Sequence, residues 1–116
     1  MGTKPPSTRQ LKVAREIQRE LAEIIRGKGM SFFSGALLTV SEVRISPDLS
    51  IARVFVSVFP SEKAEEVMGI LSDNTRMLRG ELGRKIGSQM RIVPELNFLL
   101  DSSLDYAQHI EDILKK

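Results

Sequence analysis

Apolar residues recur at helical spacing near the start of the chain. Ser7 or Thr8 can cap a helix there, and Gly27 and Gly29 favour its end near Gly27. At about 100° per residue, four apolar side chains fall on one side of this helix: Val13, Ile17, Leu21 and Ile24. The pattern predicts a long amphipathic helix, preceded by a flexible lead-in over residues 1–6.

Two segments with strand-like alternation follow. Leu37–Ile45 and Ser50–Phe59 alternate with a period of two residues, as half-buried strands do. The intervening turn, Ser46-Pro47-Asp48-Leu49, predicts an antiparallel hairpin. In the second strand, four small or β-branched side chains make one face that suits packing beneath helices: Ala52, Val54, Val56 and Val58. The opposite face carries Phe55 and is only half polar.

The next apolar repeat is helical and continues through a polar break. Ser61 is expected to cap a helix that turns Val67 and Leu71 inward. Residues 72–75, Ser-Asp-Asn-Thr, favour helix caps over helix interiors. The apolar rhythm nevertheless stays in phase across them, at Leu71, Leu78, Leu82 and Ile86. We therefore expect two consecutive helices joined by a sharp kink, the second ending at Gly87.

The last part of the chain predicts a strand and a final helix. Met90–Leu100 is strand-like, but Pro94 within it cannot donate to a ladder, so this strand should lie at a sheet edge or contain a bulge. Asp101 or Ser102 can cap a helix over Leu104–Leu114.

The predicted order is therefore helix, strand, strand, helix, kink, helix, strand, helix. This order defines an α+β fold. We expect one domain over residues 7–101, with a C-terminal helix over residues 102–116.

The composition bounds the class of protein. A chain of 116 residues with 41% hydrophobic and 28% charged residues is long enough for one globular domain. Cysteine is absent from the sequence, and no apolar run reaches the ~18 residues of a membrane span. The first residues contain no apolar segment of the secretory type. We therefore expect a cytoplasmic protein.

Charge is distributed unevenly although the net charge is only +2. Residues 1–30 carry seven Lys or Arg against three Glu, and residues 72–93 carry five basic against two acidic residues. Residues 61–71 and 94–116 are acidic, with balances of −2 and −3. Two basic segments set apart from two acidic ones can orient an anionic partner.

Catalytic and metal-binding motifs are missing from the sequence. The single histidine, His109, lies between Asp105 and Asp112 on the last predicted helix and is best explained as a solvated ion-pairing residue. The sequence has five Phe, one Tyr and no Trp, so stacking of nucleic-acid bases on aromatic side chains is not expected to dominate binding. Phe32 and Phe33 are expected to pack at the edge of the core and not to be exposed for base stacking. We expect no cofactor and no metal ion, and a small enzyme of ferredoxin-like fold is disfavoured.

Two stretches of the chain resemble the ribosome-binding factor A family of bacteria. The matching residues are Ser46-Pro47-Asp48-Leu49-Ser50, Ala52, Val54, Val56, Val93-Pro94-Glu95-Leu96, Phe98, Asp101 and Ser103. The similarity covers about residues 10–114, and the element order without the last helix is the type II KH topology. The resemblance implies a KH-like domain, a three-stranded sheet with helices on one face. It also implies a small cytoplasmic, non-enzymatic factor that associates with the small (30S) ribosomal subunit, assists late maturation of 16S rRNA and supports growth in the cold.

The kink region departs from the family pattern. There, an Ala-x-Gly kink replaces the GxxG loop of ordinary KH domains, whereas this chain has Asn74-Thr75-Arg76. A literal GxxG, Gly80 to Gly83, lies within the helical phase of the second helix and is expected to be a chance match. Gly80, Gly83 and Gly87 share one side of that helix. Tight packing against the first helix or the sheet is the favoured explanation, and close approach of a phosphate backbone is the alternative.

The candidate RNA-binding residues form two groups. The first is a basic stripe on the first helix: Arg9, Lys12, Arg15 and Arg19. The second surrounds the kink: Asn74, Thr75, Arg76, Arg79, Arg84 and Lys85, with Arg91 beside it. These residues would recognise folded RNA by shape and phosphate charge. A solvated helix face with ion pairs one turn apart explains the stripe equally well.

The expected partner is thus 16S rRNA within the small ribosomal subunit, bound by a monomer, with neither a membrane nor a small molecule as a partner. A function of another class is the alternative. In that case the Phe55/Phe59 face of the sheet and the acidic last helix would form a protein-interaction or dimerisation module.

Overall fold

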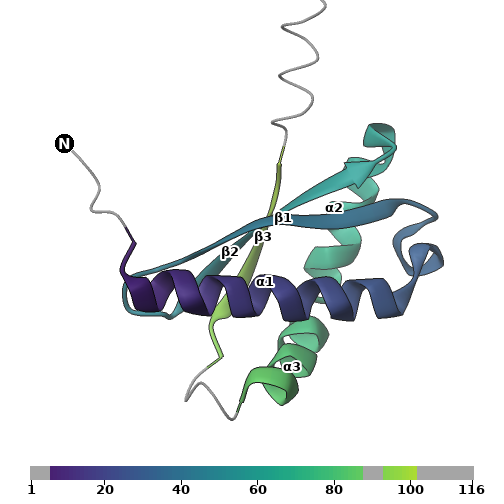
Figure 1. The fold of residues 1–116 in the computed structure, drawn as a ribbon. Helices are drawn as coiled ribbons and strands as arrows, with labels where there is room; N and C mark the ends of the chain where they lie inside the picture. The colour runs from purple at the N-terminus through teal and green to yellow at the C-terminus, as the bar shows by residue number, and fades with distance from the viewer. Residues whose placement is uncertain (1–5, 88–92, 102–116) are drawn as a thin grey trace, which may run out of the picture.

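A computed structural model describes residues 6–87 and 93–101 of the chain. Its elements are α1 (Thr8–Lys28), the short 3₁₀ helix η1 (Met30–Phe33), β1 (Leu37–Ile45), β2 (Ile51–Phe59), the 3₁₀ helix η2 (Ser61–Lys63), α2 (Ala64–Asp73), α3 (Thr75–Ile86) and β3 (Glu95–Leu100). The predicted order is confirmed from the first helix to the last strand (Figure 1). The final predicted helix, over residues 102–116, lies outside the described residues. Within the described part of the chain, no helix is long and apolar enough to cross a membrane.

Helix α1 begins where the sequence predicts because its first turn is capped on both sides. The Ser7 hydroxyl accepts from the Gln10 backbone N–H at 3.1 Å, and the Gln10 side chain accepts from the Ser7 N–H at 2.9 Å. This capping box satisfies two amide donors that have no partner within the helix. The helix then buries a stripe of five side chains: Ala14, Ile17, Leu21, Ile24 and Ile25.

The three strands form one mixed sheet in the order β1-β2-β3. β1 and β2 are antiparallel, with a bulge between Val40 and Glu42, and β2 and β3 are parallel. Alternate residues are buried along most of β1 and β2, and Leu96 is buried in β3, which places α1, α2 and α3 on one face of the sheet. Figure 1 shows α1 running along β1, with α3 beside it. We call the opposite face, which includes Thr39, Phe55 and Phe59, the outer face.

Strand β3 is shorter than the pattern predicts. It begins at Glu95, so Pro94 directly precedes the strand and does not lie inside it. The first bond to the neighbouring strand is donated by the Glu95 N–H to the Ser50 carbonyl at 2.9 Å, a role that a proline nitrogen cannot fill. The predicted edge position is confirmed, because β3 is the last strand in the sheet order β1-β2-β3 of the described residues. Residues 90–92 lie outside the described residues.

Ser61 does not cap α2 as predicted. The chain first makes the 3₁₀ turn η2, in which the Lys63 N–H donates to the Pro60 carbonyl at 3.1 Å, and α2 starts only at Ala64. The residue before α2, Lys63, makes no side-chain capping bond. Its ammonium group instead binds the Ser34 carbonyl, which connects η1 to the start of α2.

The turn between β1 and β2 is held by a compact set of hydroxyl–carboxylate bonds. Asp48 accepts from the Ser50 and Ser46 hydroxyls, both at 2.7 Å, and from the Ser50 N–H at 3.1 Å. These bonds lower the pKa of Asp48 from 3.8 to about 2, with the Ser50 hydroxyl making the largest contribution and the Ser46 hydroxyl the next. Leu49 adopts a left-handed conformation (φ 63°), a geometry that this turn must hold in place.

The lowered pKa predicts a pH-dependent contribution to stability. Because the pKa of Asp48 is depressed in the folded state, its contribution is complete above 3.8 and disappears as the pH falls towards about 2. Urea unfolding of wild type and Asp48→Asn should therefore differ most at neutral pH and converge over this acidic range. A stability difference that stays constant with pH would contradict the assignment.

Candidate nucleic-acid interface

The basic stripe of α1 is divided by ion pairing. Arg19 binds Glu16 on the preceding turn, with an Nη–Oε2 distance of 2.9 Å, and Arg26 pairs in the same way with Glu23. Arg9, Lys12 and Arg15 are exposed and have no hydrogen-bond or ion-pair partner among residues 6–87 and 93–101. The structure thus supports both sequence interpretations: the N-terminal half of the stripe keeps uncompensated charge, and Arg19 is part of a solvated pair.

The kink forms at Asn74, where α2 ends and α3 begins. The Asn74 side-chain amide donates to the Ile70 carbonyl at 2.8 Å, and the Thr75 hydroxyl donates to the Leu71 carbonyl at 2.8 Å. Both side chains are half-buried and satisfy carbonyls that the end of α2 leaves without helical partners. Their observed contacts are therefore structural, and their proposed contact with RNA stays a prediction.

Burial on both sides of the kink fixes how α3 is turned. Leu71 at the end of α2 and Leu78, Leu82 and Ile86 along α3 are completely buried. Since these residues face the core, the polar side of α3 faces outward. Arg76 and Arg84 lie on this side, and Lys85 lies at its border. All three are exposed, and none contacts a carboxylate among the described residues. The acidic residue of α3, Glu81, instead binds Lys28 of α1 at 2.7 Å.

Arg79 has a role that the sequence did not predict. Its guanidinium donates to the Val93 carbonyl at 2.6 Å and to the Pro94 carbonyl at 3.1 Å, which attaches α3 to the segment entering β3. These acceptors are backbone groups 14 and 15 residues away, so no local sequence pattern reveals them. A side chain held this way has less freedom to reach a phosphate than Arg76. Arg91, the last of the predicted residues, lies outside the described residues.

Gly80, Gly83 and Gly87, which share one side of α3, do not have a single structural explanation. A Cβ on Gly83 would lie 3.2 Å from a methyl of Val93, so this glycine permits close packing of the segment before β3. A Cβ on Gly80 would meet nothing within 4 Å. Gly87 ends α3 in a helical conformation. The predicted tight packing thus holds for Gly83, with the entry to β3 as the neighbour, whereas Gly80 lies open.

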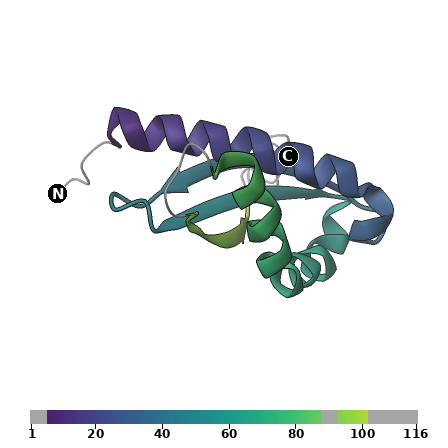
Figure 2. The same cartoon turned by 90° about the horizontal axis from the view of Figure 1, so that it is seen from below.

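Helices α1 and α3 lie side by side (Figures 1 and 2). Both carry exposed cations that have no carboxylate partner among the described residues. A three-stranded sheet covered on one face by a long helix and a bent helix pair defines the KH-like class of domain. The comparisons with known proteins are consistent with this class and make it more specific.

The sequence model of the ribosome-binding factor A family matches residues 9–114. A ribosome-binding factor A of Cytophaga hutchinsonii is 39% identical over 110 residues, which cover 95% of this chain and 83% of the relative. That of Chlorobaculum parvum is 44% identical and covers 94% and 90%. The chain belongs to the ribosome-binding factor A family, whose members are non-enzymatic factors.

Solved structures agree with this assignment. The crystal structure of ribosome-binding factor A from Thermus thermophilus superposes with a TM-score of 0.67 at 34% identity, covering 78% of this chain and 94% of that one. A model of the T. thermophilus factor, fitted into a cryo-EM map of its complex with the 30S subunit, gives a TM-score of 0.63 at 35% identity and covers 77% and 91%.

The glycine geometry predicts opposite behaviour for two alanine substitutions in α3. Gly80→Ala should stabilise the protein by up to about 1 kcal/mol, because the helix gains propensity and the new methyl meets open space. Gly83→Ala should stabilise the protein less than Gly80→Ala, or destabilise it, because the Val93 side chain must move away from the new methyl group. Urea unfolding of both variants measures the difference, and equal gains would show that Gly83 is not a packing glycine.

The Arg79 contacts predict a cost for removing its guanidinium. Arg79→Met should destabilise the protein by about 1–2 kcal/mol, because two backbone carbonyls lose a charged donor. The matched substitution Arg76→Met on the same helix should change the free energy of unfolding by less than about 0.5 kcal/mol. Equal effects of the two substitutions on the urea midpoint would contradict a clamp at Arg79.

Proposed function

We propose that this protein binds the small (30S) ribosomal subunit as a monomer in the cytoplasm and assists late maturation of 16S rRNA. It recognises folded RNA by shape and phosphate charge. Membership of the ribosome-binding factor A family supports this proposal, as does the 30S complex of the T. thermophilus relative.

The observation that carries the RNA-binding mode is the outward side of α3. Arg76, Arg84 and Lys85 are exposed and uncompensated by carboxylates in the described part of the chain. Charges of this kind neutralise phosphates and release counterions without reading bases, which suits a structured RNA whose bases are already paired. Arg9, Lys12 and Arg15 of α1 add a second group of cations without a carboxylate partner in residues 6–87 and 93–101.

The proposed mechanism is mechanical. Binding energy that favours one of two arrangements of an rRNA segment shifts the population towards that arrangement. The shift is limited by the difference in affinity between the two arrangements. Binding alone can therefore direct a maturation step, and no reactive side chain is needed.

The protein-interaction alternative keeps one specific observation in its favour. Phe59 on the outer face is 73% exposed, which is unusual for a phenylalanine in a strand. Phe55 is less available, because the Arg44 guanidinium lies over its ring at 5.5 Å from the centroid. The two phenylalanines therefore do not present one continuous aromatic surface.

Charge reversal on α3 tests the proposed function. Co-sedimentation of the double variant Arg76→Glu/Arg84→Glu with purified 30S subunits should show about a tenfold or greater loss of affinity, a change that requires only about 1.4 kcal/mol. The control is Arg53→Glu, which changes an exposed cation on the outer face. Equal retention of the α3 variant and wild type would overturn the RNA-binding mode.

The salt dependence of binding gives an independent measure. If about four phosphates are neutralised, the logarithm of the association constant should fall with the logarithm of salt concentration at a slope near −3 to −4. The α3 variant should show a shallower slope. A flat response of the wild-type protein would point to the protein-interaction alternative.

A further inference from the structure

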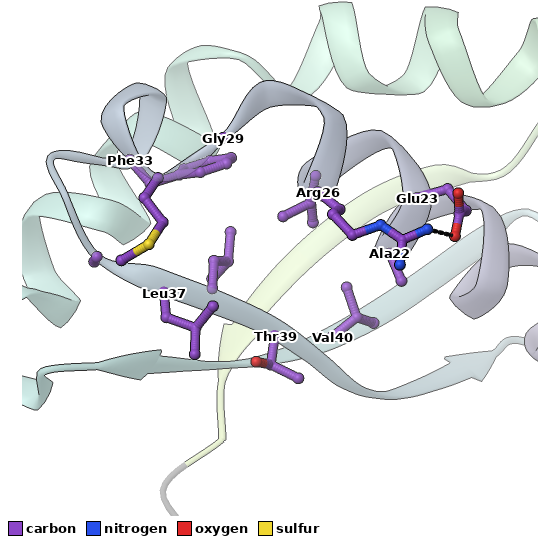
Figure 3. Close-up of a pocket in the computed structure, with 12 residues that line it drawn as sticks. Ala22, Glu23, Arg26, Gly29, Phe33, Leu37, Thr39 and Val40 are labelled. Carbon is purple, nitrogen blue, oxygen red and sulfur yellow. Dashed lines mark hydrogen bonds and ion pairs between the residues drawn. The ribbon is translucent and has the colours of Figure 1, made fainter.

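The outer face of the sheet carries an apolar pair at one end. Leu37 of β1 and Phe59 of β2 are cross-strand partners, and they are 52% and 73% exposed. We call these two residues the outer apolar patch. Leu37 also lines a cavity of about 300 Å³ between α1 and β1, together with the exposed Met30 and the buried Phe33. In Figure 3 this cavity lies beside the first residues of β1, so Leu37 belongs both to the patch and to the lining of the cavity.

The chain leaves the sheet on this same face. Asp101 follows β3 directly; its N–H donates to the Val56 carbonyl at 2.7 Å, and its carboxylate accepts from the Ser41 hydroxyl of β1 at 2.7 Å. This second bond crosses over β2, because β2 lies between β1 and β3. The exit point is thus held above the outer face at the level of the β1 bulge.

The direction of the exit leads towards the patch. β3 runs parallel to β2, and its last residue, Leu100, pairs with Val56. A chain that continues in the same direction therefore passes Ser57 and Val58 on the way to Phe59. Along β1, the four residue steps from Ser41 to Leu37 span about 13 Å.

The residues that follow have the pattern needed to cover such a patch. In a helix over residues 104–114, five side chains would fall within about 120° of one another: Tyr106, Ala107, Ile110, Ile113 and Leu114. The acidic residues Asp105, Glu111 and Asp112 would fall outside this arc. Such a helix is about 16 Å long, close to the distance from Ser41 to the patch.

From these four observations we infer that residues 102–116 fold back over the outer apolar patch of the same chain. The segment packs its apolar side against Leu37 and Phe59 and turns its acidic side to solvent. The docked segment thereby shields the outer face from self-association. The docking is intramolecular because the exit at Asp101 already holds the segment beside its site.

A spin-label experiment on the full chain tests this inference. Since the sequence contains no cysteine, Thr39→Cys provides a single attachment point on the outer face between Ser41 and Leu37. A nitroxide there should broaden the amide signals of residues 104–114. The same label on Ser57→Cys, the cross-strand partner of Thr39, should do likewise. A control label on Arg15→Cys, at the exposed surface of α1, should leave those signals unchanged.

Two further samples separate the possible occupants. One sample mixes two chains: the first carries the nitroxide but no ¹⁵N, and the second carries ¹⁵N but no nitroxide. The broadening should disappear in this mixture. Its persistence would show that a second copy covers the patch. Phe59→Ser in the labelled chain should abolish the broadening, whereas Ile51→Ser, an exposed apolar residue at the other end of β2, should retain it. Absence of broadening from both outer-face labels, or its survival in Phe59→Ser, would overturn the inference. No ribosome is present in these samples, so the result is independent of the proposed function.

Discussion

Simultaneous burial of Leu71 and Leu78 on either side of Asn74 is the constraint on which the rest of the structure depends. The two leucines are seven residues apart, so they share one face of the helical path, and both are completely excluded from solvent. The chain can therefore bend at Asn74 only if the side of α3 that carries Leu78 still packs against the core. The same requirement turns Arg76 and Arg84 away from the sheet, which links core packing directly to the charge of the surface.

The polar residues at the break make that arrangement possible. Asn74 and Thr75 use their side chains to satisfy the carbonyls of Ile70 and Leu71, so the end of α2 carries fewer unpaired backbone groups. Arg79 and Gly83 then attach α3 to the entry of β3, through two carbonyl contacts and a close approach of Val93. The bent helix pair is thus anchored to the sheet on its inner side and remains available to a partner on its outer side.

Features set by neighbours in sequence were predictable, and features set by distant groups were not. The Ser7 cap, the hairpin at Ser46–Leu49 and the break at residues 72–75 depend on local periodicity and turn chemistry, and the structure confirms them. Arg79, by contrast, depends on carbonyls beyond the end of α3. The late start of α2 is a local effect that was missed because Ser61 begins a 3₁₀ turn, closed by the Lys63 N–H and the Pro60 carbonyl, before the α-helix starts. The ion pairs of α1 are also local, because Arg19 and Arg26 each bind a carboxylate three residues earlier, and the sequence left this interpretation open beside RNA binding.

The central claim is that the outward side of α3 meets ribosomal RNA. Directed hydroxyl-radical probing tests it most directly, with an iron chelate tethered to Met77→Cys, a partly exposed position next to Arg76, in the cysteine-free chain. In complexes with the 30S subunit, this tether should cleave 16S rRNA at discrete positions, whereas a tether at Thr39→Cys on the outer face should cleave weakly or not at all. Strong cleavage from position 39 with none from position 77 would contradict the account.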